Sequence, residues 1–123
     1  MGTAGVRLGR VAPMLFVRDI ARAMRFYGDV FGLAKTFENG DPVAFVILKR
    51  DDAEVHLTRV PDHVGCAENV MHMIVHGVDE LYRRCQAADG ARIVKPLRDA
   101  PWGLRTFVVA DPDGNCIDIG ERI

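Results

Sequence analysis

The chain has few side chains that could act as nucleophiles. Serine is absent, so no serine hydrolase arrangement exists, and no phosphate-binding loop or glycine-rich dinucleotide motif follows an expected strand. Cys66, Cys85 and Cys116 stand at wide spacings that fit neither a disulfide framework nor a zinc knuckle. Cys66 has no neighbouring base, which favours an ordinary free thiol. Nucleophilic catalysis is therefore not expected.

Histidine, aspartate and tryptophan are the remaining groups that could bind a ligand. His56 and Asp118 lie in segments where polar and apolar residues alternate, as in half-buried strands. His63 falls in a connector and His76 at a strand end, where a solvated side chain is expected. Trp102, the only tryptophan, lies in a loop with proline and glycine. Its ring could stack on a planar ligand or close over the core as a lid.

Composition limits the classes of protein that this chain can be. Its 123 residues are 49% hydrophobic and 27% charged, which predicts one globular domain over residues 1–123. Sixteen Lys and Arg residues against 17 Asp and Glu residues give a net charge of −1, which argues against a nucleic-acid binder. The apolar stretch Val11–Val17 is too short for a membrane span or signal peptide. A cytoplasmic protein that does not bind membranes is expected.

Residues from about 11 to 60 predict one strand, one helix and three more strands. The helix has apolar residues at three- and four-residue steps, with Asp19 as its N-cap. Asn39-Gly40 predicts a hairpin between the second and third strands. The expected elements are the strand Pro13–Val17, the helix Ile20–Phe31 and the strands Ala34–Glu38, Val43–Leu48 and Glu54–Arg59.

Residues from about 69 to 122 predict the same order of elements, after a connector over Pro61–Glu68. Asp111–Asn115 is a turn in which proline fixes φ and glycine allows a positive φ. The segment Pro96–Gly103 is expected to be a loop. The expected elements are the strand Val70–Val75, the helix Val78–Ala88 and the strands Ala91–Val94, Arg105–Ala110 and Cys116–Gly120.

The two halves are repeats of each other. The pairs Val17 and Val75, Ile20 and Val78, and Gly32 and Gly90 are separated by the same number of residues, and they mark a strand end, a helix start and a helix stop. The chain is therefore predicted to be α+β, with two βαβββ modules whose curved mixed sheets enclose a concave cleft. The spacing leaves open whether modules pair within one chain or between two.

Three groups of motifs resemble a known superfamily, the vicinal oxygen chelate proteins, which include glyoxalases, extradiol dioxygenases and bleomycin resistance proteins. The resemblance runs from about Val11 to Glu121 and is strongest to the bleomycin resistance branch. It is carried by Ala12–Asp19 with Phe26-Tyr27 and Gly32-Leu33, by His76–Tyr82, and by Pro101–Gly103 followed by Asp111–Cys116.

The resemblance implies four places where relatives that are enzymes hold a divalent metal. They fall at about Ala12, at His56, near Val70 and at Asp118, so two of the four lack a donor atom. His72 is two residues beyond Val70 and on the same strand face. The fallback set His56, His72 and Asp118 would suit zinc, nickel, manganese or iron. This set defines the alternative, a metal-dependent lyase, isomerase or dioxygenase.

With half of these places empty, the resemblance favours a protein that needs neither metal nor cofactor. It would bind a small planar or aromatic molecule such as an antibiotic, confer resistance by sequestration, and catalyse no reaction. The expected ligand-binding residues are Phe37, Phe45, His56, Trp102, Phe107 and Asp118.

The resemblance also implies a homodimer that forms each cleft from two chains and exchanges the N-terminal strand. Pro13, which has no N–H to donate, suits an edge position there. Two features depart from the bleomycin resistance pattern. The chain is almost neutral where relatives are strongly acidic, and Leu33 replaces an aromatic residue. Both weaken bleomycin itself as the ligand.

Overall fold

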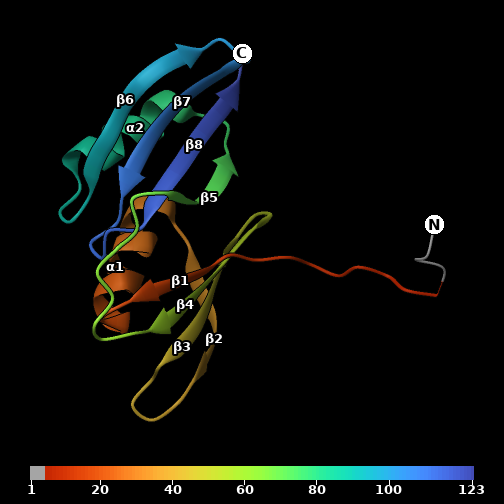
Figure 1. Cartoon of the computed structure of the whole chain (residues 1–123), viewed down its shortest axis with the longest axis vertical. Helices are drawn as coiled ribbons and strands as arrows, with labels where there is room; N and C mark the ends of the chain where they lie inside the picture. The colour runs from red at the N-terminus through yellow and green to blue at the C-terminus, as the bar shows by residue number, and fades with distance from the viewer. Residues whose placement is uncertain (1–4) are drawn as a thin grey trace.

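A computed structural model describes residues 5–123, which form two four-stranded sheets and two helices (Figure 1). The first module contains β1 (Met14–Val17), α1 (Ile20–Phe31), β2 (Ala34–Asn39), β3 (Phe45–Arg50) and β4 (Ala53–Arg59). The second contains β5 (Asn69–Ile74), α2 (Val78–Ala87), β6 (Arg92–Ala100), β7 (Leu104–Ala110) and β8 (Cys116–Arg122).

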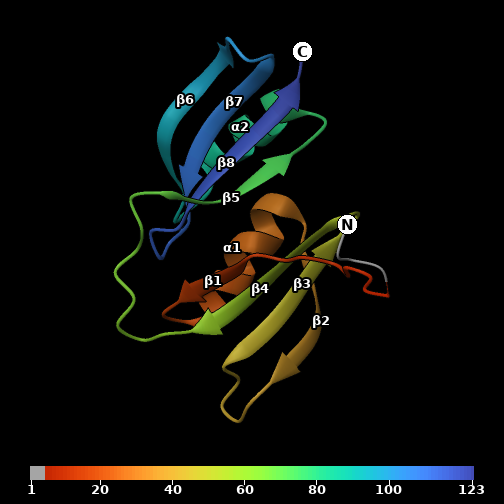
Figure 2. The same ribbon diagram turned by 45° about the vertical axis from the view of Figure 1, so that its right-hand side comes forward.

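Both sheets have the same topology. Their strand orders are β1-β4-β3-β2 and β5-β8-β7-β6. The first and last strands of each module pair in parallel, and the other pairs are antiparallel. Figures 1 and 2 show the two sheets end to end, with the helices behind them. The prediction of an α+β fold with two βαβββ modules is confirmed.

Helix α1 begins and ends where its sequence predicts. The Asp19 side chain accepts a hydrogen bond from the Arg22 N–H at 3.1 Å, which satisfies one free donor of the first turn. Gly32 ends the helix with φ of 70°, a left-handed conformation that glycine adopts without steric cost. The buried side chains of α1 lie on one face: Ile20, Ala23, Phe26, Tyr27, Val30 and Phe31.

One hydrophobic core lies between the helices and the sheets. Alternate residues of each strand point toward the helices, as the two-residue period of a strand requires. The first sheet contributes Leu15, Val17, Val46, Leu48, Val55 and Leu57, and the second contributes Phe107, Val109, Ile117 and Ile119. Within residues 5–123, no helix covers the opposite faces of the sheets. We call these the open faces.

Two segments differ from the predictions. The expected loop Pro96–Gly103 is mostly strand, because β6 continues to Ala100. Register shifts between Ile93 and Lys95 and between Lys95 and Arg98 accommodate Pro96 in this edge strand. The hairpin at Asn39-Gly40 exists, but its loop extends over residues 40–44 instead of closing in two residues.

Residues 5–13 form an arm with no helix or strand, and Figure 1 shows the arm running away from both modules. Its apolar side chains Val6, Leu8 and Val11 are 59%, 89% and 91% exposed. The arm contacts the first sheet through an ion pair of 2.5 Å between Arg10 Nε and Glu54 Oε1. Neither helix of the described chain is long and apolar enough to cross a membrane.

Candidate functional site

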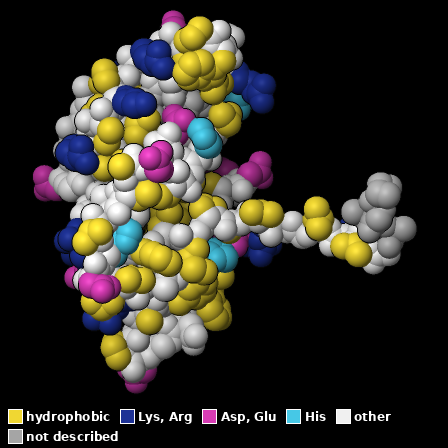
Figure 3. All heavy atoms as spheres, in the orientation of Figure 1, with side chains coloured by type: hydrophobic (Ala, Val, Ile, Leu, Met, Phe, Trp, Pro, Cys, Tyr) yellow, Lys and Arg dark blue, Asp and Glu magenta, His cyan; other side chains and the backbone are white. Residues whose placement is uncertain are grey.

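The open face of the first sheet is aromatic and apolar. Strand register places Met14, His56, Ile47 and Phe37 in one row across β1, β4, β3 and β2. The neighbouring row contains Phe16, Thr58, Phe45 and Asn39. Phe37 is 51% exposed, although moving a large apolar side chain out of water lowers the free energy. Figure 3 shows hydrophobic side chains gathered over this lower half of the molecule. The face therefore offers a surface on which a planar apolar group can rest.

His56 is the polar centre of this face. Its ring lies edge-on to Phe45 with centroids 5.4 Å apart, and Phe37 lies 6.2 Å from Phe45 in turn. His56 Nε2 is 2.6 Å from Glu54 Oε2. The hydrogen bond to His56, and then the charges of Arg10 and Lys49, hold the pKa of Glu54 below its usual range. Glu54 is thus an ionised carboxylate whose negative charge is already balanced by neighbouring groups.

The open face of the second sheet carries a histidine beside an aspartate. His72 Nδ1 lies 3.0 Å from Asp118 Oδ2, and the Thr106 hydroxyl lies 2.9 Å from Asp118 Oδ1. Because Asp118 holds Nδ1, the other ring nitrogen of His72 is left for a ligand. The His72 side chain is 75% exposed, so this nitrogen is accessible.

Strand register shows which residues lie opposite His56 and Asp118, two of the four places expected for metal ligands. Met14 lies opposite His56, and His72 lies opposite Asp118. Of the two places expected in the first strands, Ala12 precedes β1 and Val70 lies in β5, two residues before His72.

The donor atoms of one chain do not suit a divalent metal. Among residues 5–123, no group of three His, Cys, Asp or Glu side chains comes together in a way that could hold an ion. His56 lies on the first sheet, while His72 and Asp118 lie on the second. Met14, opposite His56, offers only a soft thioether sulfur, whereas nitrogen and oxygen ligands suit most divalent ions.

The predicted aromatic ligand residues lie in three different surroundings. Phe37 and Phe45 belong to the open face of the first sheet. Trp102 is 64% exposed at the turn between β6 and β7, so it is no lid on the core. Phe107 is 1% exposed and packs edge-on against Tyr82 of α2. It therefore belongs to the core, because strand alternation turns it away from Thr106 and Val108.

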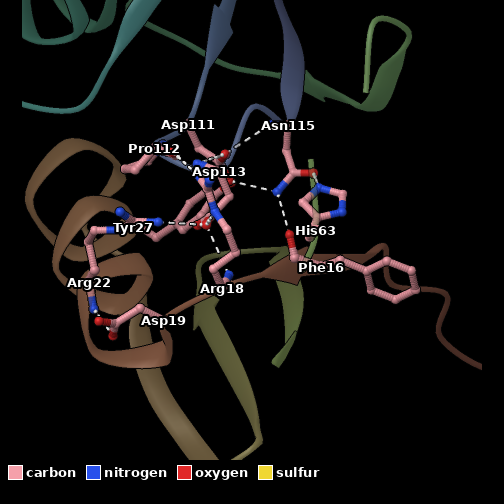
Figure 4. A network of polar contacts seen from close by, with 10 residues as sticks. All are labelled: Phe16, Arg18, Asp19, Arg22, Tyr27, His63, Asp111, Pro112, Asp113 and Asn115. Carbon is pink, nitrogen blue, oxygen red and sulfur yellow. Dashed lines mark hydrogen bonds and ion pairs between the residues drawn. The ribbon is translucent and has the colours of Figure 1, made fainter. Parts of the chain in front are cut away.

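A buried polar network joins the modules at the Asp111–Asn115 turn (Figure 4). Asp113, 1% exposed, accepts hydrogen bonds from Arg18 Nε at 3.0 Å and from Arg22 Nη2 at 2.7 Å. Tyr27 donates its hydroxyl to Asp111 at 2.6 Å. Only the packing of the two modules brings Asp113 to Arg22.

The connector histidine also takes part in this network. His63 Nε2 lies 3.1 Å from Asn115 Oδ1, and its ring lies edge-on to Phe16 at 5.9 Å. It is half-buried, although a solvated side chain was expected. Asn115 also donates to the Phe16 carbonyl at 3.0 Å, so the turn fixes the end of β1 (Figure 4).

Two surface grooves of the single chain lie away from the expected ligand residues. One, of about 840 Å³, runs between α1 and the Asp111–Asn115 turn. The other, of about 520 Å³, lies between the end of α1 and the start of α2. Neither is lined by any of the six predicted ligand residues. Those residues lie on the open faces, in the core or, for Trp102, at the turn between β6 and β7.

Comparisons with known proteins identify the family. The family model described as glyoxalase/bleomycin resistance protein/dioxygenase superfamily matches residues 7–119. A bleomycin resistance protein of Geobacillus stearothermophilus is 30% identical over 129 residues, covering 90% of this chain and 95% of that protein.

Solved structures agree with this assignment. TioX from Micromonospora sp. ML1 has a TM-score of 0.76 and 29% identity, covering 94% of this chain and 99% of that one. The bleomycin-binding protein of Streptomyces verticillus, solved with copper(II)-bleomycin, has a TM-score of 0.72 and 25% identity, covering 96% and 99%. The chain belongs to the glyoxalase/bleomycin resistance protein/dioxygenase superfamily.

Proposed function

We propose that this protein binds a small planar or aromatic molecule, of the antibiotic class, and confers resistance by sequestration without a metal. The open aromatic face of the first sheet carries this proposal. Exposed Phe37 and the Phe45–His56 pair offer stacking surfaces and a hydrogen-bonding group in one place. The bleomycin resistance protein at 30% identity and the structure solved with copper(II)-bleomycin support the same kind of role.

We propose further that two copies complete the cleft. Each chain leaves two open faces, and Met14, Phe16 and Phe37 on the first are 54%, 45% and 51% exposed. A second copy could place its second sheet opposite this face, while the exposed apolar side chains of the arm pack against it by strand exchange. Such an interface is self-complementary under two-fold symmetry. Sedimentation velocity is then expected to give the mass of two chains.

The alternative, metal-dependent catalysis, has less support from the side chains. It needs His56, His72 and Asp118 to hold one ion, and only a cleft formed by two chains could bring His56 to the other two, because they lie on different sheets of one chain. Two of their polar atoms also have partners already, since Asp118 holds His72 Nδ1 and Glu54 holds His56 Nε2.

The proposed function is tested by titrating the protein with metal-free bleomycin and with planar aromatic antibiotics in the presence of a chelator, following Trp102 fluorescence. Phe37→Ala is expected to weaken binding by about threefold to tenfold, because it removes one stacking surface. Phe37→Tyr, which keeps the ring, serves as the matched control. Binding that appears only after zinc, manganese, nickel or iron is added would instead support the alternative, a metal-dependent enzyme.

A further inference from the structure

Strand β6 carries basic side chains along the open face of the second sheet. Lys95 lies opposite Val108, and Arg98 lies opposite Thr106. Thr106 and Val108 share this face with Asp118, because Val108 pairs with Asp118 and Thr106 contacts its carboxylate. Leu97 packs into the core on the other side, which fixes Arg98 on the open face.

The basic charge of this face has little acidic compensation. Arg98, Lys95 and Arg122 form no ion pair within residues 5–123, and all three are exposed. Asp118 is the acidic residue on this face, and it already faces His72 and Thr106. Figure 3 shows Lys and Arg side chains spread over this upper half of the molecule.

The nearest other acidic groups are engaged elsewhere. Asp99 lies 2.7 Å from Arg105 Nε, and Arg105 extends toward Asp79 of α2 on the helix side of the sheet. Glu121 accepts hydrogen bonds from the backbone at the start of α2. The open face of the second module is therefore basic, although the net charge of the chain is near zero.

An aromatic ring lies beside Arg98. The guanidinium of Arg98 lies over Trp102, 5.3 Å from the ring centroid. Trp102 remains 64% exposed, so the indole and the guanidinium together offer a flat apolar surface next to a fixed positive charge. A guanidinium can also donate two parallel hydrogen bonds to a carboxylate or phosphate.

We infer that the ligand is a planar aromatic molecule carrying an anionic group, with the ring at Trp102 and the anion at Arg98 and Lys95. The inference rests on the proposed binding function and adds the charge of the ligand. A cationic drug would meet like charges here, which cost binding free energy.

The test uses three naphthalene probes of one shape, with a carboxylate, a carboxamide or a carboxamidine at the same ring position. Trp102 fluorescence and isothermal titration calorimetry report binding to the full-length protein. The carboxylate is expected to bind about tenfold or more tightly than the carboxamide, since hydrogen bonds to charged groups are the stronger ones. The carboxamidine is expected to bind most weakly.

Variants separate this charge preference from stacking. Arg98→Gln and Lys95→Gln are expected to remove the advantage of the carboxylate while leaving carboxamide affinity nearly unchanged. Arg83→Gln on α2, which changes the net charge equally, should leave the advantage intact. The advantage should also shrink as ionic strength rises to about 0.5 M, because salt screens exposed charges.

The outcomes distinguish the two proposals. Equal affinity for all three probes, or tighter binding of the carboxamidine, would overturn the anionic ligand while the binding function stands. An advantage that persists in Arg98→Gln and Lys95→Gln would place the anion elsewhere and overturn the assignment as well. Failure of every probe and every aromatic antibiotic to bind at millimolar concentration would overturn both.

Discussion

Tyr27 links the modules through one buried hydroxyl. The residue is fully buried on α1, and it donates to Asp111 of the second module over 2.6 Å. Burial, and then the charge of Asp111, raise the pKa of Tyr27 well above its usual value near 10. The folded protein therefore keeps this hydroxyl protonated at pH values where an unfolded tyrosine ionises.

Replacing Tyr27 by phenylalanine tests this link. Tyr27→Phe is expected to lower the free energy of unfolding by about 1–2 kcal/mol at pH 7, because Asp111 loses a donor. Since the folded pKa is raised, the stabilisation by the hydroxyl is complete below about pH 10 and declines as pH rises further. Urea denaturation between neutral pH and pH 11 should show less alkaline loss in the variant.

Tyr82→Phe is the matched control for this experiment. Tyr82 is half-buried against Phe107, so the same chemical change is made away from the Asp111–Asn115 turn. An equal loss in both variants at pH 7, with an unchanged alkaline slope in Tyr27→Phe, would contradict the role given to the hydroxyl.

Single residues differ in how far the sequence alone predicts their place. Alternation in β3 and β4 puts Phe45 and His56 on one side of the sheet, and the structure agrees. Alternation does not indicate which of the two faces of a strand is buried. Phe107 was therefore predicted to bind ligand, whereas it lies in the core. The pairing of Arg22 with Asp113 depends on contact between modules, which no local pattern encodes.

Helix α2 depends on a residue from a distant strand for its N-terminal cap. Gly77 precedes the helix and has no side chain to cap it, whereas Asp19 caps α1. Glu121 of β8 accepts hydrogen bonds from the N–H groups of Gly77 and Val78 at 3.0 and 2.9 Å. These backbone hydrogen bonds lower the pKa of Glu121. Charge at a helix N-terminus adds to the effect.

Removal of this cap should loosen α2. Glu121→Ala is expected to lower the melting temperature and to speed amide hydrogen exchange at Gly77 and Val78, with Glu121→Gln intermediate. Because the folded pKa is lowered, the stabilisation is complete above the unfolded pKa of about 4.3 and is lost as pH falls below it. Glu68→Ala, in the exposed connector, should change neither property. Unchanged exchange in Glu121→Ala would mean that water caps the helix equally well.

The elements themselves were largely predictable, because hydrophobic period, caps and turn residues are local signals. The repeat then gave the order of elements in both modules. The exception was β6, where proline and glycine indicated a loop. Two register shifts keep Pro96 within an edge strand, and such bulges depend on the partner strand rather than on local sequence.

The two modules of one chain share a core, but within residues 5–123 no helix covers either open face. Exposed Phe37 and Met14 lie on one, and exposed His72 and Arg98 on the other. A cleft built within one chain would need these faces to turn toward each other, whereas the network around Asp113 fixes the modules end to end. Pairing between chains needs no such change. Sequence spacing could not decide this point, since it describes each module and not their packing.

Mixing two variants that cannot bind ligand on their own tests whether the cleft forms within one chain or between two. His56→Ala with Phe37→Ala damages only the first sheet, and Arg98→Gln with Trp102→Ala damages only the second. If each cleft combines the first sheet of one chain with the second sheet of its partner, heterodimers contain one intact cleft and one doubly damaged cleft. Refolding the two variants together should then restore about one quarter of the wild-type sites.

The control mixes a variant that carries all four substitutions with the wild-type protein. Heterodimers would then contain no intact cleft if the sheets pair between chains, but one if they pair within a chain. Calorimetry with the naphthalene carboxylate counts the sites in each mixture. With wild-type homodimers included, the control should keep about one quarter of the sites if the sheets pair between chains and about one half if they pair within a chain. About one half in the control, with none in the complementing mixture, would place the complete cleft in a single chain.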